Sequence, residues 1–253
     1  MLFLKPKSVT DLNSFKRFDV NDWDQLKGHI TYKLMNTKKF NVMDNNDNII
    51  HSNKMDLTLI YIVTELSDDR KYIMSYSITK EDLKKYNKTE DEIFQIAKQN
   101  IEYDRHRRVR TLKEDSIAKE MLYPLMNFPE GVALQSANAL IEDSSQYYDN
   151  ILTITNKYNV YGSSYMFDFN LLREIKSRMN SNFYIIPMSV HQLMFVSEKY
   201  VTKNRDKYEV EDDLFDMIYE MNTKNKAEDI LTYRMYHYST EDGEILFNMK
   251  QNI

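Results

Sequence analysis

The segment Phe183–Val196, which reads FYIIPMSVHQLMFV, places a serine and a histidine two positions apart. A serine hydroxyl activated by an imidazole base is the pairing of nucleophilic catalysis, and the base must lie within about 3.2 Å of the hydroxyl. Residues two apart on a strand are separated by roughly 6.6 Å along the backbone. Ser189 and His191 can therefore cooperate directly only if the chain turns between them.

The neighbourhood of this pair lacks the other parts of a catalytic site. Position 192 is Gln, so no carboxylate follows the imidazole, and no glycine-built nucleophile elbow surrounds Ser189. The pattern favours a Pro-containing connection between two core strands, in which Ser189 closes the turn with a side-chain hydrogen bond. A ligand site at Ser189 and His191 remains the alternative interpretation.

A basic cluster stands out in a chain whose net charge is −5. Its members are Arg105, Arg107, Arg108, Arg110 and Lys113. Such a cluster can bind a phosphate backbone or an acidic partner. On a helix these side chains would spread around the axis, and a charge run of this kind is typical of a solvated face or of a helix C-terminus that matches its dipole. Nucleic-acid or acidic-partner binding is therefore an alternative rather than the favoured function.

Metal-ligating residue types are present without the spacing of a metal site. Glu102 and His106 have the i, i+4 spacing of two ligands on one helical face, but a catalytic zinc site needs a third protein ligand. The polar run Asp44–Asn48 is not a calcium loop, because no glycine occupies its sixth position and Met55 stands in place of the bidentate acid. There is no cysteine, which excludes thiolate ligands and disulfides. We expect no metal and no cofactor.

Composition excludes further classes of site. The 253 residues include only four glycines, too few for a phosphate-binding loop or a dinucleotide fingerprint. Only four residues precede Lys5-Pro6-Lys7, which is too short for a secretory segment, and no run is long enough to cross a bilayer. We therefore expect a cytoplasmic protein that does not bind membranes. The abundance of Lys, Asn, Ile and Tyr indicates an AT-rich genome, such as that of a bacterium, a phage or a mobile element.

In the first half, strand-forming residues and helix caps alternate. Met55–Val63 and Lys71–Ile78 flank a short polar turn and predict a hairpin. Thr79 with Asp82, and then Thr89 with Glu92, predict two helix starts. A further helix is expected over 114–126, and the Pro-, Gly- and Ser-containing stretch 127–150 is interpreted as a connecting segment.

The second half repeats this alternation. Strands are expected over 151–156 and 160–167, then over 182–187 and 191–196, with a final hairpin over 231–239 and 244–249. A helix capped by Asp168 or Asn170 carries the apolar stripe Leu171, Leu172, Ile175 and Met179, and another helix covers 211–221. Strands thus come in adjacent pairs with helices between the pairs. The predicted fold is α+β, with mostly antiparallel sheets built from hairpins and helices packed between and over them, in two sub-domains over 1–126 and 151–253.

The order of these segments resembles a bacterial family, domain of unknown function 5688, over most of the chain and most strongly over 151–245. Asn156 and Lys157 match its Thr-Asn-Lys element, Gly162 matches the small residue of its next strand, and Pro187, Ser189 and His191 match its Pro-Ser-x-x-His segment. Met188 and Gln192 depart from its usual serine and glutamate. The resemblance implies a fold but no reaction, because the family has no established activity.

The favoured expectation is a non-enzymatic interaction or accessory protein of a bacterial phage or mobile element, with another protein as its partner. The absence of a catalytic constellation favours this expectation. The 19 tyrosines and 15 methionines would fit a recognition surface, but such residues are more often core and strand residues. The alternative is a small-ligand-binding protein or a hydrolase-like enzyme. Its candidate site residues are Asn156, Gly162, Ser189 and His191.

Overall fold

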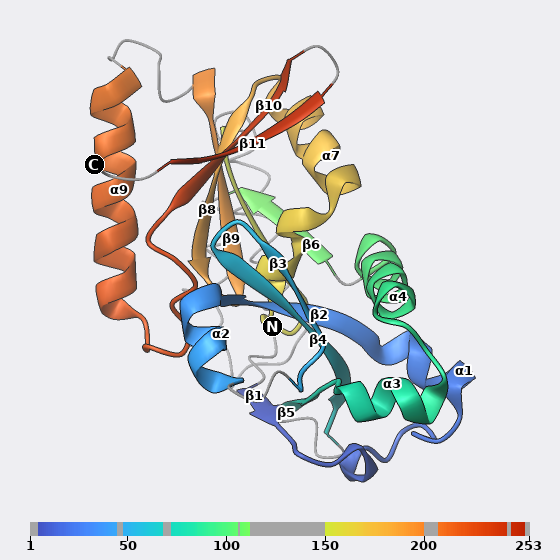
Figure 1. Cartoon of the computed structure of the whole chain (residues 1–253). Coiled ribbons are helices and arrows are strands. Elements are labelled where there is room, and N and C mark those ends of the chain that lie inside the picture. Colours follow the sequence, from blue (N-terminus) through green and yellow to red (C-terminus); the bar gives the residue numbers. More distant parts are fainter. Residues whose placement is uncertain are drawn as a thin grey trace, which may run out of the picture.

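The computed structural model describes residues 5–44, 48–67, 72–105, 107–111, 150–199, 207–241 and 244–250. These residues form two sheets, the first with strands from residues 5–77 and the second with strands from residues 107–250, and helices lie on their faces (Figure 1). The fold is therefore α+β, as predicted. The helix expected over 114–126, the connecting segment 127–150 and Lys113 lie outside the described residues, so the domain boundaries stay a prediction.

The first sheet has the strand order β1-β5-β4-β2, and β3 also pairs with β4. Its strands are β1 (Lys5–Ser8), β2 (Ile30–Asn36), β3 (His51–Lys54), β4 (Leu57–Leu66) and β5 (Tyr72–Ser77). All pairs are antiparallel except β1 with β5. The predicted hairpin is confirmed as β4 and β5, and β4 is buried along most of its length because neighbouring elements cover both of its faces.

Six helices are described in the first half. They are η1 (Leu12–Ser14), α1 (Trp23–Leu26), η2 (Lys27–His29), α2 (Thr37–Met43), α3 (Lys80–Tyr86) and α4 (Glu90–Glu102). Two of them, α3 and α4, begin at the residues that the caps predict. Thr79 caps α3 and Thr89 caps α4, each in a reciprocal capping box with the acid three residues on. The buried side of α4 presents Ile93, Ala97 and Ile101.

The second sheet is antiparallel throughout, with the order β11-β10-β8-β9-β7-β6. Its strands are β6 (Arg107–Thr111), β7 (Ile151–Asn156), β8 (Phe183–Ser189), β9 (Gln192–Ser197), β10 (Met235–Glu241) and β11 (Glu244–Lys250). The hairpins β8–β9 and β10–β11 are confirmed. The basic segment Arg107–Thr111 is a strand that pairs with β7, so the helical arrangement considered for the basic cluster does not apply to it.

Two helices cover opposite faces of this sheet, α7 (Phe169–Met179) and α9 (Lys207–Lys224) (Figure 1). Asp168 caps α7 by accepting hydrogen bonds from two backbone N–H groups, and the predicted stripe Leu171, Leu172, Ile175 and Met179 is buried. Alternate residues of β8 serve the two faces: Ile185 belongs to the core under α7, and Ile186 to the core under α9. α9 begins at Lys207, ahead of the start expected at 211.

The strand expected over 160–167 is wrong, because Gly162–Phe167 forms the 3₁₀ helix η3. Its first turn is tied to the β8–β9 connection rather than to a neighbouring strand. The backbone N–H groups of Gly162 and Ser163 donate to the carbonyl oxygens of His191 (3.1 Å) and Val190 (3.4 Å), and the Ser163 hydroxyl donates to Val190 as well (2.7 Å). Tertiary hydrogen bonds thus determine the conformation of this segment, although its amino-acid composition favours a strand.

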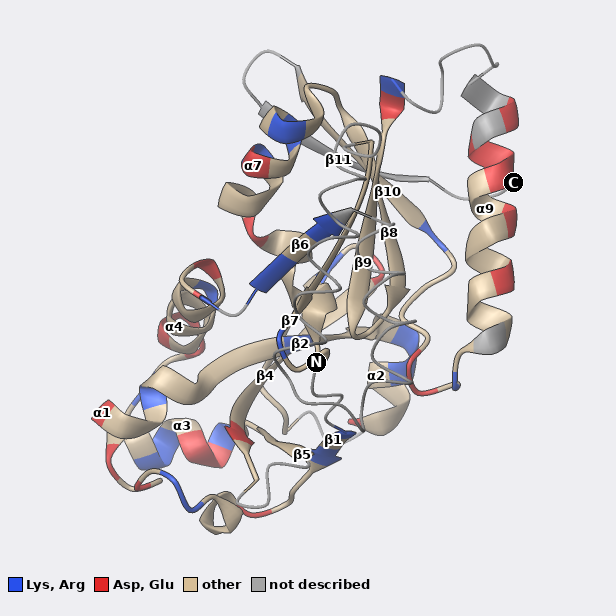
Figure 2. Cartoon of the chain, turned by 180° about the vertical axis from the view of Figure 1, so that it is seen from behind, with Lys and Arg blue, Asp and Glu red and all other residues tan. Residues whose placement is uncertain are grey.

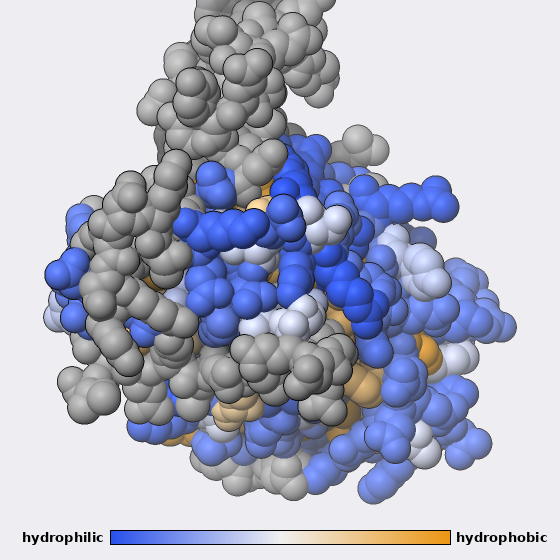
Figure 3. Space-filling view, turned by 90° about the horizontal axis from the view of Figure 1, so that it is seen from above, coloured by the Kyte–Doolittle hydropathy of each residue, from blue (hydrophilic) through white to orange (hydrophobic). Residues whose placement is uncertain are grey.

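The two halves share one hydrophobic core. The largest cluster of buried side chains contains Leu34 and Tyr61 from the first sheet and Leu152 and Phe195 from the second. A polar contact adds to it: the Asp56 carboxylate, before β4, accepts hydrogen bonds from the hydroxyls of Thr232 and Tyr236, both at 2.7 Å. In the view from above, the described surface is mainly hydrophilic with small hydrophobic spots (Figure 3). None of the described helices is long and apolar enough to cross a membrane.

Candidate functional site

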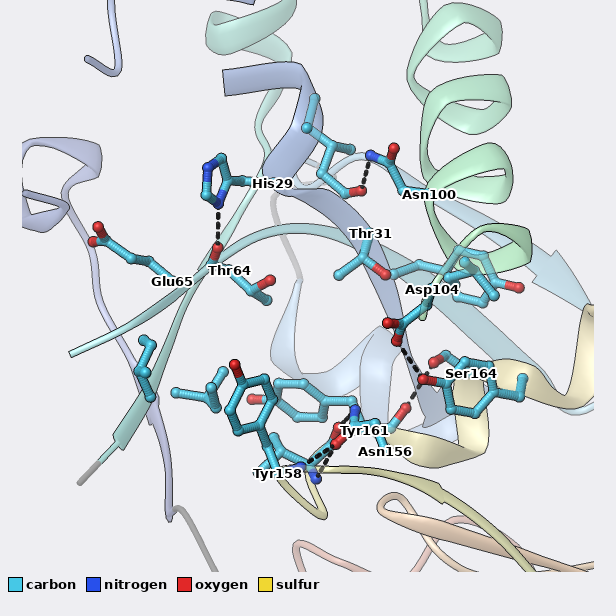
Figure 4. A pocket seen from close by; sticks show the side chains of 18 of the residues that line it. His29, Thr31, Thr64, Glu65, Asn100, Asp104, Asn156, Tyr158, Tyr161 and Ser164 are labelled. Atoms are coloured by element: carbon cyan, nitrogen blue, oxygen red, sulfur yellow. Dashed lines mark hydrogen bonds between the residues drawn. The ribbon is translucent and has the colours of Figure 1, made fainter. Parts of the chain in front are cut away.

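A cavity of about 420 Å³ lies between the two sheets, beside the edge strand β2 (Figure 4). Three parts of the chain form its walls: β2 with β4, the C-terminal end of α4, and the segment between β7 and η3. Its polar and aromatic lining residues are Arg17, His29, Thr31, Tyr32, Thr64, Glu65, Asn100, Asp104, Asn156, Tyr158, Tyr161, Ser164 and Tyr165. Gly28, Ile30, Leu66, Ile73, Ile101 and Val160 complete the lining.

The sheet wall presents hydroxyl groups and a neutral imidazole. Thr31 and Thr64 lie on the same face, because Thr31 pairs with Ile62 and side chains alternate along β4. The His29 ring stacks on Phe18 at 3.9 Å between centroids, and its Nδ1 lies 3.2 Å from the Thr64 carbonyl oxygen. A carbonyl can only accept, so Nδ1 carries the proton. Burial lowers the pKa of His29, which keeps the ring neutral.

The carboxylate of Asp104 enters from the end of α4. The backbone N–H of Asp104 donates to the Ile101 carbonyl (3.1 Å), which closes the last turn and directs the side chain toward η3 (Figure 4). The Tyr165 hydroxyl donates to this carboxylate. Burial and the negative charge of Asp104 raise the pKa of Tyr165 far above its ordinary value, so the phenol stays protonated and remains a donor.

Asn156 fixes the floor of the cavity. Its side-chain oxygen accepts from the N–H groups of Tyr158 (3.0 Å) and Val160 (3.3 Å), and its amide donates to the Val160 carbonyl (2.8 Å). One side chain therefore holds the whole turn after β7. This turn places Tyr158 in the wall of the cavity.

Tyr161 is held in an unusual backbone conformation next to that turn. Its φ is 58°, in the left-handed region that few residues with a side chain adopt. Its N–H donates to Nδ1 of His191 (3.1 Å), and its hydroxyl lies 3.1 Å from the Ser75 hydroxyl on β5. These contacts at both ends fix the ring as a wall between the two halves.

Ser189 and His191 lie in the β8–β9 turn and do not form a nucleophile and base. The Ser189 hydroxyl oxygen accepts from the backbone N–H of His191 (3.1 Å), not from its ring. The ring accepts from Tyr161 at Nδ1, and Nε2 lies 3.2 Å from the Asp229 carboxylate. Asp229 could not be predicted as the partner of His191, because it comes from a distant segment of the chain. Both ring nitrogens thus have structural partners.

Gly162 meets His191 at the same turn. A Cβ at position 162 would lie 2.4 Å from the His191 carbonyl oxygen and 2.7 Å from Thr155 Cα, both backbone atoms. Of the four candidate residues, Gly162, Ser189 and His191 therefore come together as supports of the Tyr161 wall, and Asn156 alone among them lines the cavity.

Comparison with known proteins gives one match. The family of unknown function DUF5688 matches residues 6–240. The chain belongs to this family. No curated protein and no solved structure matches it.

In this DUF5688 protein the arginines of the basic cluster point to different faces, because most of them lie on the strand β6. The Arg107 guanidinium donates to Asp168 (2.9 Å) and Glu174 (3.0 Å), which ties β6 to α7. Arg108 and Arg110 point to the opposite face because side chains alternate along β6, and Arg105 lies before the strand. Figure 2 shows β6 as a basic strand beside α7. The described members therefore do not form a single patch.

The residues that sequence reasoning missed are those that only the tertiary fold brings together. Thr64, Asp104 and Tyr161 come from separate segments, and none belongs to a short motif. Within the described ranges, no three His, Asp or Glu side chains gather as a metal site.

The Ser164 hydroxyl donates to the Tyr161 carbonyl (2.7 Å). The lining offers hydrogen-bonding groups, the carboxylates of Glu65 and Asp104, and aromatic surface, which suits non-covalent binding.

Proposed function

We propose that this DUF5688 protein binds a small molecule non-covalently in the cavity between its two sheets. The observation that carries the proposal is the cavity itself. Its volume of about 420 Å³ lies within the usual range for ligand pockets, and it occupies the junction of two packed units, where such pockets concentrate. Its lining combines aromatic and aliphatic surface with a few convergent polar groups, as expected of a binding site.

The site's hydrogen bonds favour binding over covalent catalysis. A nucleophile needs a base within hydrogen-bond reach. The Ser164 hydroxyl is engaged with a backbone carbonyl, and His191 is held by Tyr161 and Asp229. The hydrolase-like alternative at Ser189 would require His191 to abandon both partners, so it receives no support from this geometry.

Native mass spectrometry of the purified protein tests the proposal, with a matched pair of variants at one wall. Thr64→Phe fills the cavity, whereas Thr64→Val keeps its volume and removes only the hydroxyl. We expect a small molecule that is retained by the wild type and by Thr64→Val and is lost from Thr64→Phe.

Thr31→Phe, from the neighbouring strand, repeats the test in case Thr64→Phe does not fold, and circular dichroism verifies the fold of each variant. Equal retention by the wild type and by a folded cavity-filling variant would rule out this cavity as the site. So would an empty wild type that also binds nothing in a screen of polar metabolites.

A second candidate function, binding of another protein, is supported by two exposed tyrosines. Tyr219 on α9 and Tyr233 before β10 are 65% and 51% exposed, and their ring centroids lie 6.1 Å apart. Exposed aromatic pairs are typical of interface anchors. The surrounding outer face of α9 is acidic (Figure 2), with Asp212, Asp216 and Glu220 exposed, so a basic partner surface is the best complement.

A quantitative pull-down from a bacterial host of this protein tests that candidate. We expect a specific partner that is recovered with the wild type and with the control variant Tyr103→Ser, which removes another exposed tyrosine. The double variant Tyr219→Ser/Tyr233→Ser should lose the partner. Recovery unchanged in the double variant would argue against this surface.

The setting expected from the sequence, a cytoplasmic protein of a bacterial phage or mobile element, belongs to the same proposal. The absence of cysteine and the AT-rich codon signature of the composition support it. Fractionation of cells that express the tagged chain should recover it in the cytoplasmic fraction. Genomic neighbours that are typical chromosomal metabolic genes would contradict the mobile-element origin.

A further inference from the structure

We propose that the cavity selects a small organic cation, a primary amine carried on an apolar or aromatic body. This inference rests on the proposed ligand binding and names the class of ligand. It depends on where the charged groups of the lining lie, on what already engages them, and on the surface that faces the one carboxylate directed inward.

The charged lining residues are Arg17, Glu65 and Asp104, and they are divided between two sides of the cavity, with Arg17 next to Glu65. Glu65 is 4% exposed, and its two oxygens accept from the backbone N–H groups of Lys16 (3.0 Å) and Arg17 (2.5 Å). Its carboxylate lies at the far side of the cavity from Asp104 and points away from it (Figure 4). The Asp104 carboxylate instead lies against η3, where it accepts from the Tyr165 hydroxyl (Figure 4).

The environment of Asp104 is acidic. Asp168, which is fully buried, and Glu174 share the single guanidinium of Arg107. Burial is the largest cause of the raised pKa of both Tyr165 and Tyr32; the charge of Asp104 adds to it at Tyr165, where Arg107 partly offsets it, and the charge of Asp168 adds to it at Tyr32. Two lining tyrosines from different elements thus experience negative charge, and a ligand cation placed there would be favoured by the same field.

The remaining lining suits the body of such an amine. Tyr158, Tyr161 and Val160 form one wall, and Leu66 and Ile73 face it from the first sheet. Faces of tyrosine rings attract cations, and here Lys157 already lies 4.7 Å from the Tyr158 ring centre and Lys33 lies 5.7 Å from that of Tyr161. Neither lysine lines the cavity. An amine ligand would therefore meet a carboxylate at one end and apolar surface along its length.

Three probes of equal body and different charge test this class: phenethylamine, phenethyl alcohol and 3-phenylpropionate. Equilibrium dialysis at low ionic strength should show the amine binding at least about tenfold more tightly than the alcohol, with the carboxylate weakest. Asp104→Asn should weaken amine binding by about tenfold and leave alcohol binding unchanged. The Asn oxygen can still accept from the Tyr165 hydroxyl, so the variant should fold.

Asp24→Asn is the matched control, because Asp24 is an exposed carboxylate that does not line the cavity. It should bind all three probes as the wild type does. If amine and alcohol bind equally and Thr64→Phe blocks both, the amine class is wrong while binding in the cavity stands. If amine binding survives in both Asp104→Asn and Thr64→Phe, the amine binds elsewhere and the inference is overturned. It is likewise overturned if no probe binds.

Discussion

The backbone packs too closely around Gly162 to admit a side chain there. The atoms that a Cβ would meet are the His191 carbonyl oxygen at 2.4 Å and Thr155 Cα at 2.7 Å, which belong to paired strands or their turn and cannot move independently. Gly28 lines the same cavity, yet a Cβ there would have no neighbour within 4 Å. Adding a side chain is therefore expected to destabilise the fold at position 162 but not at position 28.

We expect Gly162→Ala to lower the free energy of unfolding by about 2–3 kcal/mol, through overpacking against rigid backbone. Gly28→Ala should change it by less than about 1 kcal/mol. Urea denaturation followed by circular dichroism measures both. A small effect at position 162 would mean that the β8–β9 turn can retreat from η3.

Two histidines should make stability depend on pH. Burial lowers the pKa of His191, only partly offset by Asp229, and burial likewise lowers the pKa of His29. Both rings are therefore neutral in the folded protein, while the unfolded chain takes up protons below its ordinary histidine pKa of 6.5. Their contribution to stability is complete above that pH and is lost as the pH falls from it toward the folded pKa values.

The measurement is the urea midpoint at about pH 7.5 and about pH 5.5. The wild type should lose stability at the lower pH, and the double variant His29→Gln/His191→Gln should lose less. The difference between the two proteins isolates the histidines from the carboxylates. Parallel pH profiles would show that these rings are not neutral when folded.

Single residues also show how far sequence alone reaches. Asn156 could be singled out because its match lies in a short local element. Asp104 could not, since its role depends on Tyr165, which packs against it from the other half. The acid beside His191 was missed for the same reason, because Asp229 lies far along the chain from the β8–β9 turn.

Among the elements, the two capping boxes of the first half differ in burial. Asp82 is 7% exposed, and one of its oxygens accepts from the Thr79 N–H (2.8 Å), the Thr79 hydroxyl (2.7 Å) and the Tyr76 hydroxyl (2.8 Å). Glu92 is exposed and accepts from the Thr89 N–H (2.8 Å) and from Lys88 (3.0 Å). The same motif therefore ties α3 to the sheet but caps α4 only locally.

We expect Asp82→Ala to cost about 2–3 kcal/mol, because it leaves buried donors without a partner. Glu92→Ala should cost about 1 kcal/mol or less, since water replaces the lost bonds. Thermal or urea unfolding of the two variants provides the comparison. Equal losses would mean that the Tyr76 contact adds nothing to the cap.

Elements with local signals were predicted well, and those fixed by distant partners were not. The β4–β5, β8–β9 and β10–β11 hairpins follow from short turns between strand-forming runs. The sequence of β6 is highly charged, so its pairing with β7 could not be predicted from strand-forming residues. Gly162–Phe167 forms η3 because the carbonyl oxygens of Val190 and His191 accept hydrogen bonds from it. No local propensity encodes either outcome.

At the scale of the whole molecule, the shared core and the Asp56 contact predict a single unfolding transition. Trp23 is the one tryptophan and lies in α1, so its fluorescence follows the first half. Far-UV circular dichroism follows both halves. Because residues of both sheets form one cluster, the two transitions should coincide in urea. An earlier fluorescence transition would show that the halves unfold separately.

Asp56→Ala should shift both transitions together, by about 2–3 kcal/mol, because two hydroxyl donors lose a charged acceptor. Asp24→Ala, at a side chain that is 79% exposed, should change stability by less than about 1 kcal/mol. A variant at position 56 that moves only one transition would identify the contact as belonging to one half alone.

The turn that Asn156 holds has a consequence for the rate at which anything enters the cavity. Three hydrogen bonds of the Asn156 side-chain amide already order this turn. Binding of a ligand therefore need not order it further, and the conformational entropy cost of binding is small. Association should then follow a single exponential whose rate rises linearly with concentration, without the plateau that a slow rearrangement imposes.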